Sequence, residues 1–172
     1  GLPFLLGQLS KHATALLSSQ TPPAIDFLDP DKTVERSVDS LRDFIIALDK
    51  EKADKLRYKV EDDVVKVFIT PYKTTISEKD LQFSQGDYNV DVVIAIGISK
   101  REDLDKAIVA HGRILHDAEV LTINASDKKS SLGSVDWSDT SASSIAQMLV
   151  SISEPFGSGL IDEQISTALF TG

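Results

Sequence analysis

The residues best suited to chemistry lie in one stretch, between Ala118 and Ser144. An apolar run, Val120 to Ile123, leads into a polar segment that starts with Asn124-Ala125-Ser126. Further on, Asp139-Thr140-Ser141 has the residue types that begin a helix. We interpret the stretch as a strand, a loop and a helix N-terminus, which is where α/β proteins usually hold a ligand.

Five side chains of this stretch are candidate ligands for a phosphate or a nucleotide: Lys128, Lys129, Ser141, Ser143 and Ser144. The ammonium groups would bind an anion beside the N–H groups at the start of the helix. The competing interpretation, which we favour for the two lysines, is a solvated loop. For the serines the competing role is capping, and we expect Ser141 or Asp139 to cap the helix. The local sequence supplies no base for a serine nucleophile.

The composition excludes several classes of protein. Among 172 residues, 27 are Asp or Glu and 18 are Lys or Arg, a net charge of −9, which argues against general nucleic-acid or membrane-surface binding. Without cysteine the chain has no disulfide or thiolate metal site, and this fits the cytoplasm. No apolar run is long enough to span a membrane. The chain starts at Gly1 and stops within an apolar pattern, so we expect a piece of a longer protein.

Apolar patterns predict the elements around this stretch. Continuous runs at Asp43–Leu48, Val90–Ile96 and Val120–Ile123 predict buried parallel strands. Helical spacing predicts helices over residues 99–111, with a capping box of Ser99 and Glu102, and over 141–153 and 160–170. Alternation on either side of Glu61-Asp62-Asp63 predicts a hairpin over residues 55–70. The predicted fold is α/β, with three layers and a mostly parallel sheet flanked by helices. The hairpin would be an insertion within a single domain, 1–172.

Several of these residues resemble the DHH superfamily of phosphoesterases, which includes RecJ-like exonucleases, oligoribonucleotide and pAp phosphatases and cyclic dinucleotide phosphodiesterases. The family has an apolar strand ending in Ile, which Ile123 matches, and a later aromatic or Leu followed by Gly, which Leu132-Gly133 matches. Its next helix opens on a segment similar to Asp139–Ser144, and residues 165–172 resemble its following apolar helix. The hairpin is similar to one in relatives from small-genome bacteria.

The departures from this family fall on its metal ligands. Asn124-Ala125-Ser126 stands where the family has Asp-His-His, and Lys129 stands where it has Asn. Gly97 replaces a metal-binding Asp at the end of an earlier strand. The resemblance implies two Mn²⁺ ions that activate a water and hold the phosphate. A neutral amide, a methyl group and a hydroxyl cannot neutralise such a pair, so we predict no catalytic residue and no metal site in this chain.

Three functions remain open. The first is a catalytically degenerate DHH-type module that binds a nucleotide, a phosphate or a protein. The chain would alternatively be an active phosphodiesterase on short oligonucleotides or cyclic dinucleotides, with Mn (or Mg), when part of the full-length protein. A purely structural domain is the third. The expected partners are a nucleotide or phosphate ligand, a second copy of the chain, or other domains of the parent protein.

Overall fold

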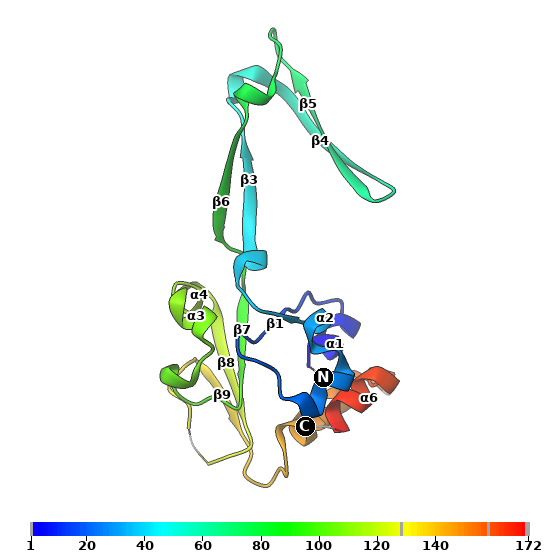
Figure 1. Ribbon diagram of the computed structural model, residues 1–172, viewed down its shortest axis with the longest axis vertical. Helices are drawn as coiled ribbons and strands as arrows, with labels where there is room; N and C mark the ends of the chain where they lie inside the picture. Colours follow the sequence, from blue (N-terminus) through cyan, green and yellow to red (C-terminus); the bar gives the residue numbers. More distant parts are fainter. Residues whose placement is uncertain (1, 128, 158, 171–172) are drawn as a thin grey trace. The chain divides into compact units, whose positions relative to one another are not determined.

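A computed structural model describes residues 2–127, 129–157 and 159–170 of the chain. Helices and strands are mixed, and the strands form small sheets (Figure 1). The chain divides into two compact units. We call residues 42–89 the ribbon unit, and residues 1–41 with 90–172 the sheet unit. No helix in the described ranges has the length and apolarity that crossing a membrane requires.

The sheet unit is built around three parallel strands, β7 (Val92–Ile96), β8 (Glu119–Asn124) and β9 (Val135–Ser138), in the order β7-β8-β9. A short parallel pair, β1 (Ala15–Leu16) and β2 (Val34–Glu35), precedes them. The strands predicted at 90–96 and 120–123 are therefore present and parallel. The α-helices of this unit are α1 (Leu2–Gln8), α2 (Pro30–Thr33), α3 (Lys106–Ala110), α4 (Ile114–Asp117), α5 (Ile145–Ser153) and α6 (Glu163–Phe170).

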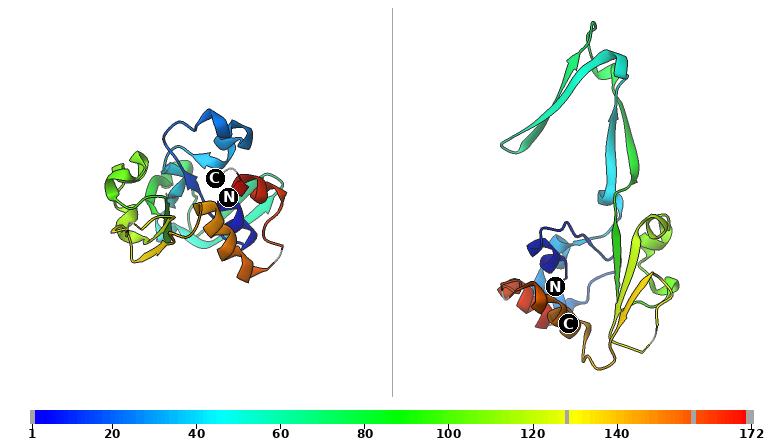
Figure 2. Two further views of the ribbon diagram at one scale, coloured as in Figure 1. Left: turned by 90° about the horizontal axis from the view of Figure 1, so that it is seen from below. Right: turned by 180° about the vertical axis from the view of Figure 1, so that it is seen from behind.

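The main core of the sheet unit lies where α1, α5 and α6 meet β8, and Figure 2 draws these three helices side by side. Its buried residues are Leu5, Ile123, Met148, Leu149, Leu160, Ile165 and Leu169. On α5, Met148 and Leu149 lie three and four residues after Ile145, which packs against the same core, and on α6 Ile165 and Leu169 are four residues apart, as expected of core-facing helical stripes. The C-terminal end of β8, at Ile123, therefore packs against helix α5.

The ribbon unit consists of two antiparallel pairs. Strand β3 (Arg42–Ala47) pairs with β6 (Gln82–Tyr88), and β4 (Ala53–Glu61) pairs with β5 (Val64–Pro71). The β4–β5 pair is the hairpin that the sequence predicts over residues 55–70, and it turns at Asp62, whose φ of 49° is in the left-handed region. Asp adopts this conformation more readily than most residues because its short polar side chain can bond locally.

One predicted strand forms, but its pairing and its burial differ from the prediction. The run Asp43–Leu48 was expected to be a buried parallel strand, but β3 is antiparallel to β6, and Phe44 and Ile46 are exposed. A continuous apolar run indicates that both faces of a strand favour burial. It does not say whether the chain supplies neighbours for those faces, and here the partner is a single strand.

All three predicted helices begin later in the chain than expected, and the helix predicted from Leu160 begins at Glu163. The helix expected from Ser99 begins at Lys106, because Asp105 is the N-cap and accepts a hydrogen bond from the Ala107 N–H at 2.9 Å. The helix expected from Ser141 begins at Ile145, because the Ser144 hydroxyl caps it by accepting from the Gln147 N–H at 3.2 Å. In both places a later residue satisfies the free N–H groups of the first turn.

Candidate functional site

The parallel sheet brings the predicted site positions to one edge. Because β7, β8 and β9 run in the same direction, their C-terminal ends meet. The Gly97 N–H donates to the Ile123 carbonyl at 2.9 Å, and the Asp139 N–H donates to the Asn124 carbonyl at 3.1 Å. Gly97 and Asp139, which directly follow β7 and β9, thus continue the hydrogen bonding of the sheet beyond the ends of these strands.

Glycine is required at position 97 because of the backbone conformation at this turn. Its φ is +72°, a conformation that residues with a Cβ rarely adopt. A Cβ at this position would meet Ile145 of α5 at 3.5 Å, an ordinary contact distance. The glycine therefore serves the turn at the end of β7, and it offers no side chain to a metal ion or a ligand.

Asn124 is committed to a hydrogen bond within the protein. Its side chain is buried, with 3% of the residue exposed. Its Nδ2 donates to the Ile98 carbonyl at 3.3 Å and so joins the end of β8 to the segment after β7. Ala125 packs against the main core, and Ser126 is half-buried. The three consecutive positions 124 to 126 thus hold an amide, a methyl group and a hydroxyl.

This set of donors does not fit a pair of divalent cations. Such ions prefer carboxylate and imidazole ligands. Within residues 2–127, 129–157 and 159–170, no three His, Asp or Glu side chains converge in a way that could hold a metal ion. The residues present at this edge can hold the sheet together, and they give no step of metal-assisted hydrolysis.

The carboxylate that organises the neighbouring loop is Asp136, which the sequence analysis missed. The Thr122 hydroxyl, fully buried in β8, donates to Asp136 Oδ1 at 2.5 Å. The Ser130 N–H donates to Asp136 Oδ2 at 3.0 Å. The Thr122 bond is the largest reason why the pKa of Asp136 lies below its ordinary value, and the positive charge of Lys129 adds to the effect. The alternation of Val135 and Trp137 with Asp136 and Ser138 was the available indication of strand β9.

A second glycine holds the loop close to the sheet. An added Cβ at Gly133 would lie 1.9 Å from the Val120 carbonyl oxygen, so the two backbones approach too closely for any side chain. Gly133 therefore has a packing role in this fold. The loop between β8 and β9 is anchored at Ser130 and at Gly133.

The five candidate ligands for an anion have local partners where they are described. Lys128 lies outside the described residues, and Lys129 is exposed beside Asp136. The N–H and hydroxyl of Ser141 donate to Asp139 Oδ1 at 2.8 and 2.6 Å, and these bonds lower the pKa of Asp139. The N–H and hydroxyl of Ser143 donate to Gln147 Oε1 at 2.7 and 2.9 Å. Ser144 caps α5 and borders a shallow, mainly apolar hollow between α5 and α6.

No protein-family model matches this chain, and no characterised protein matches its sequence.

Proposed function

We propose that this chain is a catalytically degenerate DHH-type phosphoesterase-like domain that works as a protein-interaction module. The proposal includes a three-layer arrangement of the sheet unit. It is supported by Figures 1 and 2, where α3 and α4 are drawn on one side of β7–β9 and α1, α5 and α6 on the other. It is further supported by the sheet edge, where Gly97 and Asn124 have backbone and hydrogen-bonding roles.

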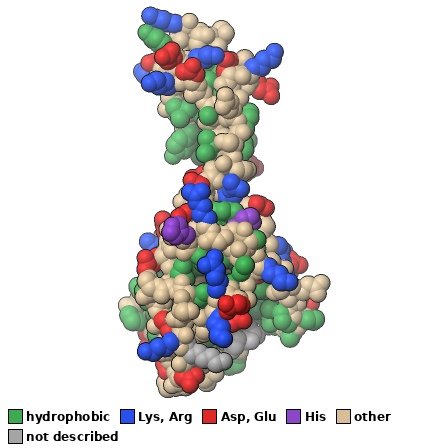
Figure 3. All heavy atoms as spheres, turned by 90° about the vertical axis from the view of Figure 1, so that its left-hand side faces the viewer, with side chains coloured by type: hydrophobic (Ala, Val, Ile, Leu, Met, Phe, Trp, Pro, Cys, Tyr) green, Lys and Arg blue, Asp and Glu red, His purple; other side chains and the backbone are tan. Residues whose placement is uncertain are grey.

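The single observation that carries the interaction role is the exposed apolar surface of the ribbon unit. Phe44 and Phe83 stack with their ring centroids 6.0 Å apart, and Ile46 lies opposite Phe83 on the same face of the β3–β6 pair. Phe44 is 61% exposed and Phe83 54%. Figure 3 shows hydrophobic side chains at the surface of this unit. Apolar surface gathered in this way is typical of a site for another protein.

The charge of the ribbon unit also suits association. It contains nine Lys and Arg and ten Asp and Glu, whereas the sheet unit carries nearly all of the net charge of −9. A nearly neutral surface with exposed apolar groups can approach another protein without strong repulsion. The cytoplasm is the proposed location, since the chain has no cysteine.

The lack of catalysis is tested by adding MnCl₂ to the chain. Calorimetry measures Mn²⁺ binding, and hydrolysis of a generic phosphodiester measures activity. We expect no Mn²⁺-dependent turnover above the blank. Turnover that co-elutes with the chain in size-exclusion chromatography would overturn the proposal and support an active phosphodiesterase. Turnover that separates from the chain comes from a contaminating nuclease, and the proposal stands.

Nucleotide binding is tested separately by thermal shift with a panel of nucleotides and inorganic phosphate. We expect no stabilisation by any of them. A shift that disappears in Lys128→Ala, Lys129→Ala would replace the protein-interaction role by anion binding at the loop between β8 and β9. Asp127→Ala, in the same loop, is the matched control, because it does not remove a cation.

A further inference from the structure

The β4–β5 hairpin has one apolar face. Its register pairs Leu56 with Ile69, Tyr58 with Val67, and Val60 with Val65. Because side chains alternate between the two faces of a strand, these three directly opposed pairs lie on the same face. The face is thus a continuous double row of six apolar side chains. We call it the apolar hairpin face.

The apolar hairpin face is open to solvent in the structure. Leu56 is 73% exposed, Tyr58 75% and Val67 52%. Val60 and Val65 are exposed as well, and Ile69 is half-buried. A two-stranded hairpin has marginal stability in water unless another layer covers it. Covering this face would therefore stabilise the hairpin as well as form an interface.

The opposite face of the hairpin is polar and already has its own contacts. Glu61 accepts from Lys59 at 2.6 Å and from Lys66 at 2.5 Å, and these two bonds lower the pKa of Glu61. The Arg57 guanidinium lies 4.6 Å from the centre of the Phe68 ring. Burial of this face would remove several cations from water, which is costly. The hairpin is therefore amphipathic, and its apolar face is the one suited to an interface.

We propose that a second copy of this chain covers the apolar hairpin face, a proposal that rests on the interaction role argued above. The two copies pack face to face about a two-fold axis near the Tyr58–Val67 pair. A uniformly apolar face is complementary to itself, as a two-fold interface requires. Each exposed side chain leaves on the order of 100 Å² in water, so the two faces together bury about 1,000 Å², near the minimum for a specific interface.

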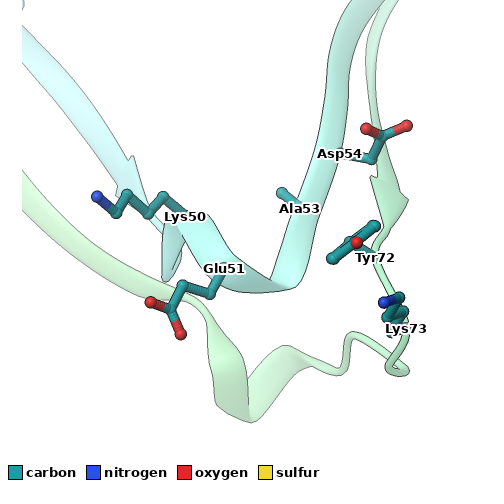
Figure 4. Close-up of a pocket in the computed structure, with 6 residues that line it drawn as sticks. All are labelled: Lys50, Glu51, Ala53, Asp54, Tyr72 and Lys73. Atoms are coloured by element: carbon teal, nitrogen blue, oxygen red, sulfur yellow. The ribbon is translucent and has the colours of Figure 1, made fainter.

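The charges at the ends of the hairpin select the antiparallel arrangement. The turn carries Glu61, Asp62 and Asp63. A parallel arrangement would bring the acidic turns of both copies together, and like charges repel. The antiparallel arrangement places each turn near the base of the other hairpin. Figure 4 shows this base, where Lys50 and Lys73 lie among the residues that line an open hollow and accompany two acidic side chains.

The first test measures the mass of the full chain in solution by sedimentation equilibrium. We expect a dimer with a dissociation constant in roughly the micromolar range. Tyr58→Lys, Val67→Glu places an opposed ion pair on the apolar hairpin face and should weaken the dimer at least 100-fold. The matched control, Arg57→Lys, Phe68→Glu, places the same pair on the polar face and should leave the dimer intact. Opposite charges across a strand pair are compatible with the hairpin, and circular dichroism checks that both variants fold.

The second test uses the absence of cysteine in the chain. Val67→Cys should give a covalent dimer with a short bismaleimide, and Phe68→Cys, on the polar face, should not. A wild type that stays monomeric at all concentrations overturns the proposed dimer. So does a dimer that crosslinks equally through both cysteines or is unaffected by Tyr58→Lys, Val67→Glu. These results overturn only the dimer, because the proposed function depends on the exposed Phe44–Phe83 surface of the β3–β6 pair and on the absence of Mn²⁺-dependent turnover.

Discussion

Thr122 and Asp136 are joined by a hydrogen bond of 2.5 Å between Oγ1 and Oδ1, which ties the buried middle of β8 to β9. The same carboxylate accepts from the Ser130 N–H, so one side chain fixes both a strand and the loop that leads to it. The hydroxyl of Thr122 and the carboxylate of Asp136 therefore stabilise the fold.

Thr122→Val should loosen the β8–β9 loop. Valine has nearly the shape of threonine and fits the buried position, but it has no hydroxyl to donate to Asp136. We expect a loss of about 1 kcal/mol in the free energy of unfolding, measured by urea denaturation. The pKa of Asp136 should rise towards its ordinary value, which a carboxyl NMR titration detects. An unchanged pKa would show that the Thr122 bond is not its main cause.

Gly133→Ala should be among the most damaging small substitutions. The added methyl group would lie 1.9 Å from the Val120 carbonyl oxygen, so the loop or the strand has to move. We expect a destabilisation of about 3 kcal/mol or more, visible as a lower thermal midpoint. Gly7→Ala in α1 is the control. A Cβ there has no neighbour within 4 Å, and alanine favours a helix, so stability should stay equal or increase.

The ribbon unit should lose stability in acid through Asp80. A hydrogen bond from Lys52 at 2.5 Å is the main reason why the pKa of Asp80 falls from 3.8 to about 2, and two bonds from Ser77 add to it. A lowered pKa means that the carboxylate stabilises the fold above pH 3.8 and that this contribution is lost as the pH falls through 2. Amide exchange in β3 and β6 should therefore accelerate over this range. Asp80→Asn should exchange faster than the wild type at pH 6 and show a weaker dependence on acid.

Asn124→Asp places a carboxylate at the end of β8 and should still not create a metal site. A carboxylate at this buried position faces the Ile98 carbonyl, whereas a protonated carboxyl can donate to it as the amide does. Burial should raise the pKa of the new group, so its penalty grows as the pH rises above the ordinary value. We expect a loss of about 2 kcal/mol at pH 7 and less at pH 4, by urea denaturation. Binding of Mn²⁺ by this variant in calorimetry would contradict our description of the edge.

The β4–β5 hairpin and the strands β7 and β8 of the parallel sheet could be predicted because their patterns are local. Alternation on both sides of an acidic turn determines the hairpin at residues 55–70, and the runs before Gly97 and Asn124 determine β7 and β8. The polar character of Asn124 and Ser126 was likewise plain from the sequence, as was the lack of a side chain at Gly97.

Only the tertiary structure decided which of these residues have partners. Asp43–Leu48 has the composition of a buried strand but pairs with β6 alone. The Asp136 carboxylate became important because Thr122 lies opposite it on the paired strand β8. The N-caps are Asp105 and Ser144, and not the residues predicted earlier in the chain, because the side chains of Asp105 and Ser144 accept hydrogen bonds from the free N–H groups of α3 and α5. Composition and spacing determine what an element can bury or bond. Which neighbour it meets depends on contacts between segments far apart in the chain.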